Sequence, residues 1–303
     1  MRLLLLLLPL AAAAAAAAAP LVDETRVLSP FVSLSICAPL SVRVRATPPG
    51  APHPYYARLR GERTVLDALV LTQARAAVAG VAVELMKPVK TDNLVEIDLF
   101  APPRVFQYAE RVLAGGDTMV SVPFSPDKCE IAASGGGNWW VVSNGTAAKD
   151  GAAVGVGLAK VSLGAPGSFY ANAPSPYWEV FASDAGAAAR VDGANGTVSA
   201  RLDAGSATVN PSTQDVSIGG YVIAGRLSYS RGTCSVRDEG GGKGAACAKV
   251  APSGPPDPPP LRWACGFETT GEWACGGGGR GGAPSVRETA CRAGAGERDM
   301  MRI

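Results

Sequence analysis

Short runs of alternating apolar and polar residues dominate the stretch from residue 191 to residue 229. Val198, Ala200 and Leu202 are separated by single polar residues, and Gly, Asn, Asp or Pro interrupts the pattern every few positions. Strict alternation is typical of a half-buried β-strand, and the interruptions are typical of tight turns. The stretch therefore predicts a series of brief strands whose small inner side chains suit coils stacked on one another.

The same alternation occurs upstream. Leu34 and Ile36 are flanked by serines, residues 41–45 alternate again, and residues 94–100 form a clean strand pattern. Residues 63–80 fit either a short helix or a strand. Further short strands are predicted at 118–122, 138–142, 153–158, 161–163 and 177–182.

Roughly fifteen short strands with turn residues between them predict an all-β protein. The Gly-rich turns and small inner residues favour a right-handed β-solenoid, a β-helix-like stack of short strands. A β-sandwich is the alternative, because no strict sequence period separates the two architectures.

Residues 1–19 predict a secretory signal peptide. One positive charge at Arg2 precedes a leucine and alanine run, and Ala17 and Ala19 form an Ala-x-Ala cleavage site. The pattern also fits an uncleaved anchor or an organellar transit peptide. Since no later run is long and apolar enough to cross a bilayer, we expect no integral membrane span after signal removal. The expected location is extracellular or at the cell surface, with an organelle as the alternative.

The remaining chain divides at about residue 250. Residues 21–250 suit one β-solenoid domain with a sizeable core. Residues 251–303 form a tail rich in Pro and Gly with few apolar residues, which predicts a polyproline-type linker followed by disorder.

Charge composition argues against a nucleic-acid partner. The chain has 28 Lys and Arg against 26 Asp and Glu, giving a formal net charge of +2, and it carries no basic block. A nucleic-acid-binding protein needs a concentrated positive surface.

Cysteines and Asn-Gly-Thr triplets predict covalent modification in an oxidising compartment. Seven cysteines are an odd number, so at least one is free or forms an intermolecular disulfide. Cys234 and Cys247 are the candidate local disulfide, since they flank a Gly-rich loop. Asn144 and Asn195 are candidate glycosylation sites, although such triplets also arise by chance in a Gly- and Thr-rich chain.

Residues that could support catalysis or hold a cofactor are scarce. His53 is the single histidine and lies between two prolines in a loop. The cysteines lack paired spacing for a metal, and the Gly-rich segments lack the Lys-Ser/Thr ending of a phosphate loop. We therefore expect no catalytic residue, no metal and no cofactor.

Three aspartates keep an enzyme alternative open. Asp192, Asp203 and Asp215 follow one another at nearly equal spacing. On neighbouring coils they could flank a glycosidic bond or hold calcium. A turn-forming role explains them more simply.

Aromatic residues supply the candidate ligand-binding site: Trp139, Trp140, Tyr177 and Trp178. Trp139 and Trp140 point to opposite faces if they lie in a strand, so one indole would face outward. Exposed aromatic rings stack on sugar rings or on a partner surface. The alternative is that one Trp lies in the core and a loop covers the other.

Residues 31–45 and 94–103, followed by the Gly/Asp/Ser-rich ladder, resemble the putative adhesin family with the auto-transporter-type GIN head domain. The resemblance covers roughly residues 27–227 and rests on pattern. It implies a signal peptide, a β-solenoid-like domain and an adhesive role without a catalytic motif.

We therefore expect a secreted or cell-surface, non-catalytic binding or adhesion protein that recognises a glycan or a protein surface. A polysaccharide-active solenoid enzyme using acidic residues is one alternative. A structural matrix component is the other.

Overall fold

The computed structural model describes residues 20–74, 79–87, 89, 91, 95–112, 116–143, 157–239 and 247–258, with the backbones of 265–267 and 273–275. The predicted signal peptide therefore lies outside the described residues, as do most of residues 251–303. Strands dominate the described chain, which contains one short helix.

The elements in chain order are β1 (Leu21–Val27), β2 (Ser33–Ile36), β3 (Val42–Ala46), β4 (Tyr56–Glu62), α1 (Arg63–Ala68), β5 (Leu69–Ala74), β6 (Gly80–Leu85), β7 (Glu96–Ala101), β8 (Tyr108–Arg111), β9 (Asp117–Ser121), β10 (Lys128–Ala133), β11 (Asn138–Val142), β12 (Leu158–Leu163), β13 (Gly167–Ala182), β14 (Ala187–Leu202), β15 (Ser206–Asn210), β16 (Ser217–Val222), β17 (Arg226–Tyr229), β18 (Thr233–Asp238), β19 (Cys247–Lys249), β20 (Cys265–Phe267) and β21 (Trp273–Cys275).

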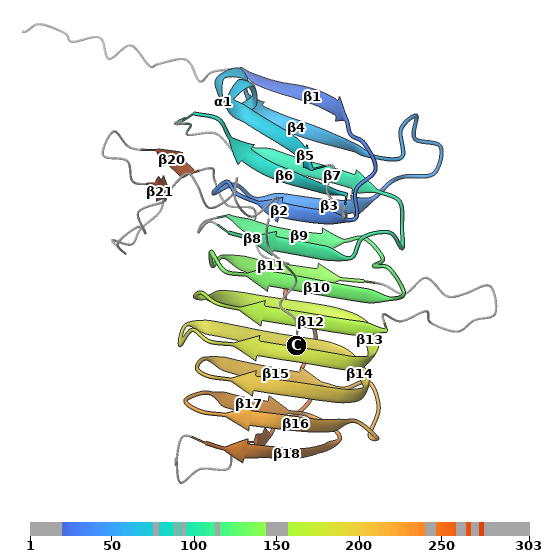
Figure 1. Ribbon diagram of the computed structural model, residues 1–303, viewed down its shortest axis with the longest axis vertical. Coiled ribbons are helices and arrows are strands. Elements are labelled where there is room, and N and C mark those ends of the chain that lie inside the picture. The colour runs from blue at the N-terminus through green and yellow to red at the C-terminus, as the bar shows by residue number, and fades with distance from the viewer. Residues whose placement is uncertain are drawn as a thin grey trace, which may run out of the picture.

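Strands β2 to β19, apart from β4 and β5, stack in two parallel ladders (Figure 1). Ladder 1 has the order β6-β2-β8-β10-β12-β13-β14-β16-β18. Ladder 2 has the order β7-β3-β9-β11-β13-β14-β15-β17-β19. The long strands β13 and β14 contribute their first half to ladder 2 and their second half to ladder 1, which joins the two ladders into one sheet.

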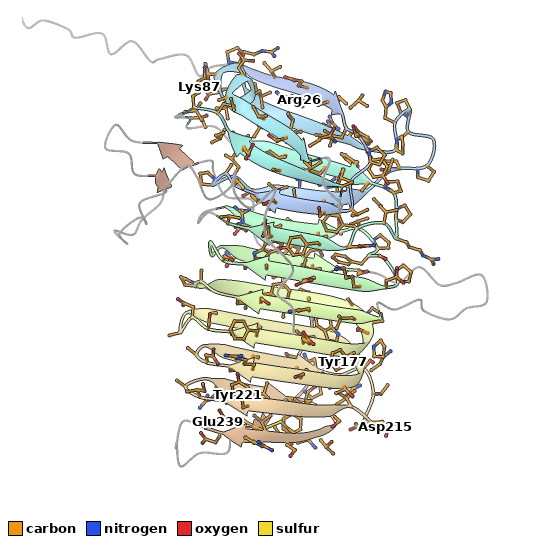
Figure 2. All side chains as sticks on the ribbon, in the orientation of Figure 1. Arg26, Lys87, Tyr177, Asp215, Tyr221 and Glu239 are labelled. Atoms are coloured by element: carbon orange, nitrogen blue, oxygen red, sulfur yellow. A yellow bond between two sulfur atoms is a disulfide. The ribbon has the colours of Figure 1, made fainter. Side chains whose placement is uncertain are left out.

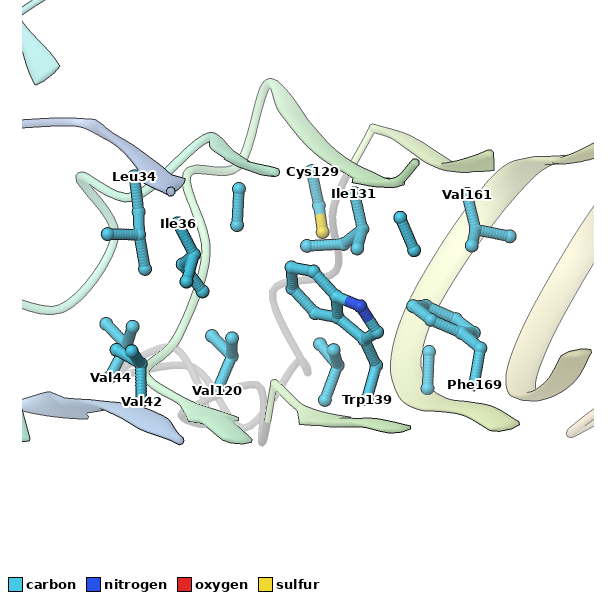
Figure 3. Close-up of a cluster of buried hydrophobic side chains, with 14 of the residues drawn as sticks. Leu34, Ile36, Val42, Val44, Val120, Cys129, Ile131, Trp139, Val161 and Phe169 are labelled. Carbon is cyan, nitrogen blue, oxygen red and sulfur yellow. The ribbon is translucent and has the colours of Figure 1, made fainter. Parts of the chain in front are cut away.

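The core fills the space between the two ladders. Figure 3 shows Leu34, Ile131 and Val161 from ladder 1 facing Val120 and Phe169 from ladder 2. Each of these side chains is at most 2% exposed. Because side chains alternate along a strand, every second residue points into this core and the others form the outer faces.

Antiparallel elements cover the N-terminal end of the stack. β4 pairs antiparallel with both β7 and β1, and β5 pairs antiparallel with β6. Helix α1 buries Val65, Leu66 and Ala68, and Arg26 donates to the carbonyl oxygens of Leu66 at 2.8 Å and Leu69 at 2.6 Å. Residues 63–80, which fit helix or strand by pattern, thus contain both.

Each level of the stack consists of one strand segment from each ladder. The number of residues from one level to the next is not revealed by the sequence pattern. Tyr177, Thr197 and Ser217 are register partners on successive levels of ladder 1 and are equally spaced along the chain. Elsewhere the step changes: Lys128 pairs with Leu158, and Ser217 pairs with Thr233. Connections of unequal length therefore hide the period.

One inner position carries a charge. Arg111 pairs in ladder 1 with Ile36 and Ala133 and is fully buried. Its guanidinium donates to Leu40 O at 3.0 Å and to Thr118 Oγ1 at 2.8 Å, with a longer bond to Ala38 O at 3.3 Å. Burial lowers its pKa to about 10, and the charge of Asp117 opposes that shift. Arg111 thus donates to carbonyls in the turn between β2 and β3, where a buried carbonyl needs a partner.

A disulfide joins the two ladders at the last level. Cys234 in β18 and Cys247 in β19 are bonded, which confirms the predicted local disulfide. Cys37 is disulfide-bonded as well, whereas Cys129 is a free, buried thiol. Burial raises the pKa of the Cys129 thiol well above its ordinary value.

The all-β class is confirmed. Parallel pairing between successive levels is the pattern that stacked coils require, whereas β-sandwiches are built from antiparallel strands. The right-handed solenoid itself stays a prediction.

Close approach between levels gives a stability prediction at Gly220. Its φ is +124°, and a Cβ there would lie 1.9 Å from the carbonyl oxygen of Ala200. We expect Gly220→Ala to lower the free energy of unfolding by about 2–4 kcal/mol, measured by denaturant or thermal unfolding.

The neighbouring residue supplies the control. A Cβ at Gly219 would have its nearest contact at 3.9 Å, and Gly219→Ala should change stability by less than about 0.5 kcal/mol. Equal effects of the two substitutions would contradict the packing described for this level.

Candidate functional site

The outer faces of the stack display side chains in columns. Residues at the same register on successive levels lie one strand spacing apart, about 4.8 Å. Flat side chains in such a column can stack on one another from level to level. Two columns of this kind contain aromatic and arginine residues, one on each ladder.

The column on ladder 1 consists of Phe181, Arg201 and Tyr221, here called the aromatic–arginine column. The three are register partners on β13, β14 and β16. The guanidinium carbon of Arg201 lies 5.1 Å from the Phe181 ring centroid and 5.2 Å from that of Tyr221. Both separations are in the range of cation–π attraction.

Asp203 fixes the guanidinium between the two rings. It accepts from Arg201 Nε at 3.1 Å and from Arg201 Nη2 at 3.2 Å. The hydrogen bond with Asp203 raises the pKa of Arg201, so the guanidinium stays charged. The Arg201 side chain is 55% exposed, which leaves donors available on the outer side.

Charged residues continue the polar surface beside this column. Lys160 Nζ lies 3.9 Å from a Glu130 oxygen and 3.7 Å from a Glu179 oxygen, so the three form a column of alternating charge across β10, β12 and β13. These partly exposed pairs each contribute little to stability. They make this part of ladder 1 polar.

The column on ladder 2 consists of Trp140, Tyr170 and Arg190, here called the tryptophan column. The ring centroids of Trp140 and Tyr170 are 6.2 Å apart, and the guanidinium carbon of Arg190 lies 5.7 Å from the Tyr170 centroid. Asp192 accepts from Arg190 Nε at 3.1 Å and from Nη2 at 3.0 Å. The same Arg-x-Asp pair thus occurs twice, with both arginines in β14 and one pair on each ladder.

The two columns differ in what covers them. Tyr170 is only 4% exposed, and the Trp140 indole nitrogen is buried without a hydrogen-bond partner among the described residues. Arg190 Nη2 also donates to the carbonyl oxygen of Ser253 at 2.8 Å. The aromatic–arginine column is therefore open at Arg201, whereas the tryptophan column is covered at Tyr170 and half-buried at Trp140.

The structure does not bring the four predicted aromatic residues together. Trp139 and Trp178 are each 2% exposed and belong to the core. Tyr177 is 38% exposed on the outer face of ladder 1, and Trp140 lies on ladder 2. The four residues do not share one surface, because adjacent residues in a strand point to opposite faces. Ligand binding by Tyr177 or Trp140 stays a prediction.

The three aspartates of the enzyme alternative do not share a surface. Asp192 lies in ladder 2, Asp203 follows the end of β14 in ladder 1, and Asp215 is exposed in the loop between β15 and β16 (Figure 2). Asp192 and Asp203 each pair with their own arginine. The observation that supported an enzyme is thereby removed.

The remaining candidate residues are placed as follows. His53 is exposed in its proline loop, and Asn195 is exposed at the bend of β14. Asn144 lies outside the described residues. In the described part of the chain, no three His, Cys, Asp or Glu side chains form a group that could hold a metal ion. No helix there is long and apolar enough to cross a membrane.

The sequence contained a signal for the aromatic–arginine column that alternation alone does not reveal. Phe181, Arg201 and Tyr221 are equally spaced along the chain, and their spacing is the level repeat of this part of the stack. A search at that spacing would have aligned them.

Comparisons with known proteins give structural likeness only. No protein-family model and no curated protein matches the chain. A putative adhesin from Bacteroides fragilis is similar over 77% of this chain and 94% of its own, with 12% identity and a TM-score of 0.48. A putative adhesin from Parabacteroides distasonis is similar over 77% and 95%, with 10% identity and a TM-score of 0.46. A protein from the same species described as a putative lipid binding protein has 13% identity, a TM-score of 0.40 and coverage of 76% and 96%. The GIN head domain is not identified by these matches.

The covered tyrosine gives a pH prediction. Burial first, and then the charge of Asp192, raise the pKa of Tyr170 from 10.0 to about 12. Its hydroxyl is near Asp192 and Asn172 but makes a well-formed hydrogen bond with neither. The fold favours the neutral phenol, so this contribution to the free energy of unfolding is complete below pH 10 and is lost as the pH rises through about 12.

Unfolding of wild type and Tyr170→Phe should therefore be compared between pH 8 and 12. We expect the stability difference between the two proteins to change only above about pH 10. A constant difference across the range would contradict the covered position of Tyr170.

Proposed function

We propose that this protein is a secreted or cell-surface binding protein without catalytic activity, and that it binds a glycan through the aromatic–arginine column. The observation that carries the proposal is the exposed guanidinium of Arg201, held between Phe181 and Tyr221 on an open face of the stack. The location rests on the leader pattern of residues 1–19.

The chemistry of the column suits an oxygen-rich ligand. Asp203 uses Nε and one terminal nitrogen of Arg201, and the other terminal nitrogen remains a donor for hydroxyl or carboxylate oxygens. Asp203 and the two rings restrict the guanidinium before the ligand arrives, so binding costs less side-chain entropy. Ring edges and Tyr221 add apolar contact and a further hydroxyl.

The separation of Asp192 and Asp203 favours binding over hydrolysis. Most glycoside hydrolases place two carboxylates on either side of one glycosidic bond. Asp192 and Asp203 lie on different ladders and are each paired with arginine. A bound glycan should therefore be released unchanged.

An array of neutral and uronic-acid oligosaccharides tests the proposal with the full-length protein. Oligosaccharides on the array that bind the wild-type protein are called retained. Arg201→Ala should weaken binding of the retained oligosaccharides by about tenfold or more, which corresponds to about 1.4 kcal/mol. Affinities of wild type and variant are to be measured by calorimetry.

Arg190→Ala is the matched control, because it removes the equivalent Arg-x-Asp arginine from the same strand on the covered ladder. It should leave oligosaccharide affinity unchanged. Binding that is insensitive to Arg201→Ala, or cleavage of the bound oligosaccharides, would rule the proposal out.

A further inference from the structure

The chain after β19, the final strand of ladder 2, turns back across the outer face of that ladder. Val250 N donates to Tyr229 O of β17 at 2.8 Å. Three residues later, Ser253 O accepts from Asn210 at the end of β15 at 3.5 Å and from Arg190 of β14 at 2.8 Å. The segment therefore runs from the level of β17 past β15 to β14, in the direction of the N-terminal end of the stack (Figure 1).

The composition of this segment explains why it does not form another strand. Residues 251–258 read Ala-Pro-Ser-Gly-Pro-Pro-Asp-Pro, with no assigned helix or strand. Proline lacks an N–H group and its ring restricts φ to the polyproline II range, so the segment cannot pair in a ladder. Its carbonyl oxygens remain acceptors, and Arg190 and Asn210 provide matching donors.

The surface ahead of Ser253 carries the kinds of side chain that bind polyproline segments. Sites for such segments are lined with aromatic rings that pack against prolines and with donors that reach backbone carbonyls. Tyr170 and Trp140 lie one and two levels beyond Arg190, and the Trp140 indole N–H is buried without a partner among the described residues. The tryptophan column thus offers both kinds of group.

The lengths agree. A polyproline II chain advances about 3.1 Å per residue, so the five steps from Ser253 to Pro258 span about 15 Å. Strand levels are about 4.8 Å apart, so this distance covers about three levels. A segment anchored at Arg190 is long enough to reach Tyr170 and Trp140.

We infer that the outer face of ladder 2 is a recognition site for an extended proline-rich chain, and that residues 251–258 of the same molecule occupy it as an intramolecular strap. All eight residues of the strap are exposed, so it lies on the surface of ladder 2. A proline-rich segment of another protein competes for the same site. This inference does not rest on glycan binding, which uses the other ladder.

A peptide competition experiment on the full-length protein tests the inference. The probe is a fluorescein-labelled peptide with the sequence of residues 251–260, followed by fluorescence anisotropy. Wild type should bind it weakly, since its own strap competes at high effective concentration. Pro255→Gly combined with Pro256→Gly weakens the strap and should increase peptide affinity at least tenfold.

Adding a third substitution locates the site. Arg190→Ala in the Pro-to-Gly protein should abolish most of the gained affinity, whereas the matched Arg201→Ala should preserve it. Circular dichroism and thermal melting establish that each variant is folded. Equal effects of the two arginine substitutions, or no gain on weakening the strap, would overturn the inference.

The oligomeric state separates the strap from an exchanged segment. Wild type should sediment as a monomer at every concentration at which residues 251–258 stay bound to ladder 2. A dimer whose dissociation releases the segment would place it on a second copy and overturn the intramolecular assignment.

Discussion

Register between levels is the constraint on which the rest of this structure depends. Each strand of a middle level forms parallel hydrogen bonds with the level before and the level after it, so every turn must return the chain to the same register. Gly220 meets this requirement by allowing backbone contact with Ala200 that a side chain would prevent. Arg111 contributes from inside the core, where its guanidinium donates to two carbonyls in the turn between β2 and β3. The disulfide between β18 and β19 holds the final level together.

The same register creates the functional surfaces. Because outer side chains repeat level by level, single residues become columns, and an arginine can lie between the rings of its two neighbours. Strand β14 spans both ladders and carries the arginine of an Arg-x-Asp pair on each. On ladder 1 the pair faces outward and is open, whereas on ladder 2 its arginine also donates to the proline-rich segment. The same local sequence thus has different surroundings on the two ladders.

Much of the fold could be predicted from alternation, because the inner face of each strand must be apolar. The strands around Leu34, Ile97 and Val198 and the Cys234–Cys247 disulfide follow from the sequence in this way. Arg111 could not be predicted, since its place among apolar neighbours depends on carbonyls of another level. The aromatic–arginine column was not predicted. Alternation requires that one residue of each Trp139–Trp140 and Tyr177–Trp178 pair lies inside, but it does not say which residues align across levels. That alignment requires the register.

Hydrogen-exchange mass spectrometry of the full-length protein, with and without a retained oligosaccharide, tests the central claim that ligand binding occurs on the open outer face of ladder 1. We expect added protection in peptides that contain Phe181, Arg201 and Tyr221, with ladder 2 and the N-terminal elements unchanged. Protection confined to the loop around His53, to the β1–β4 cap or to ladder 2 would contradict it.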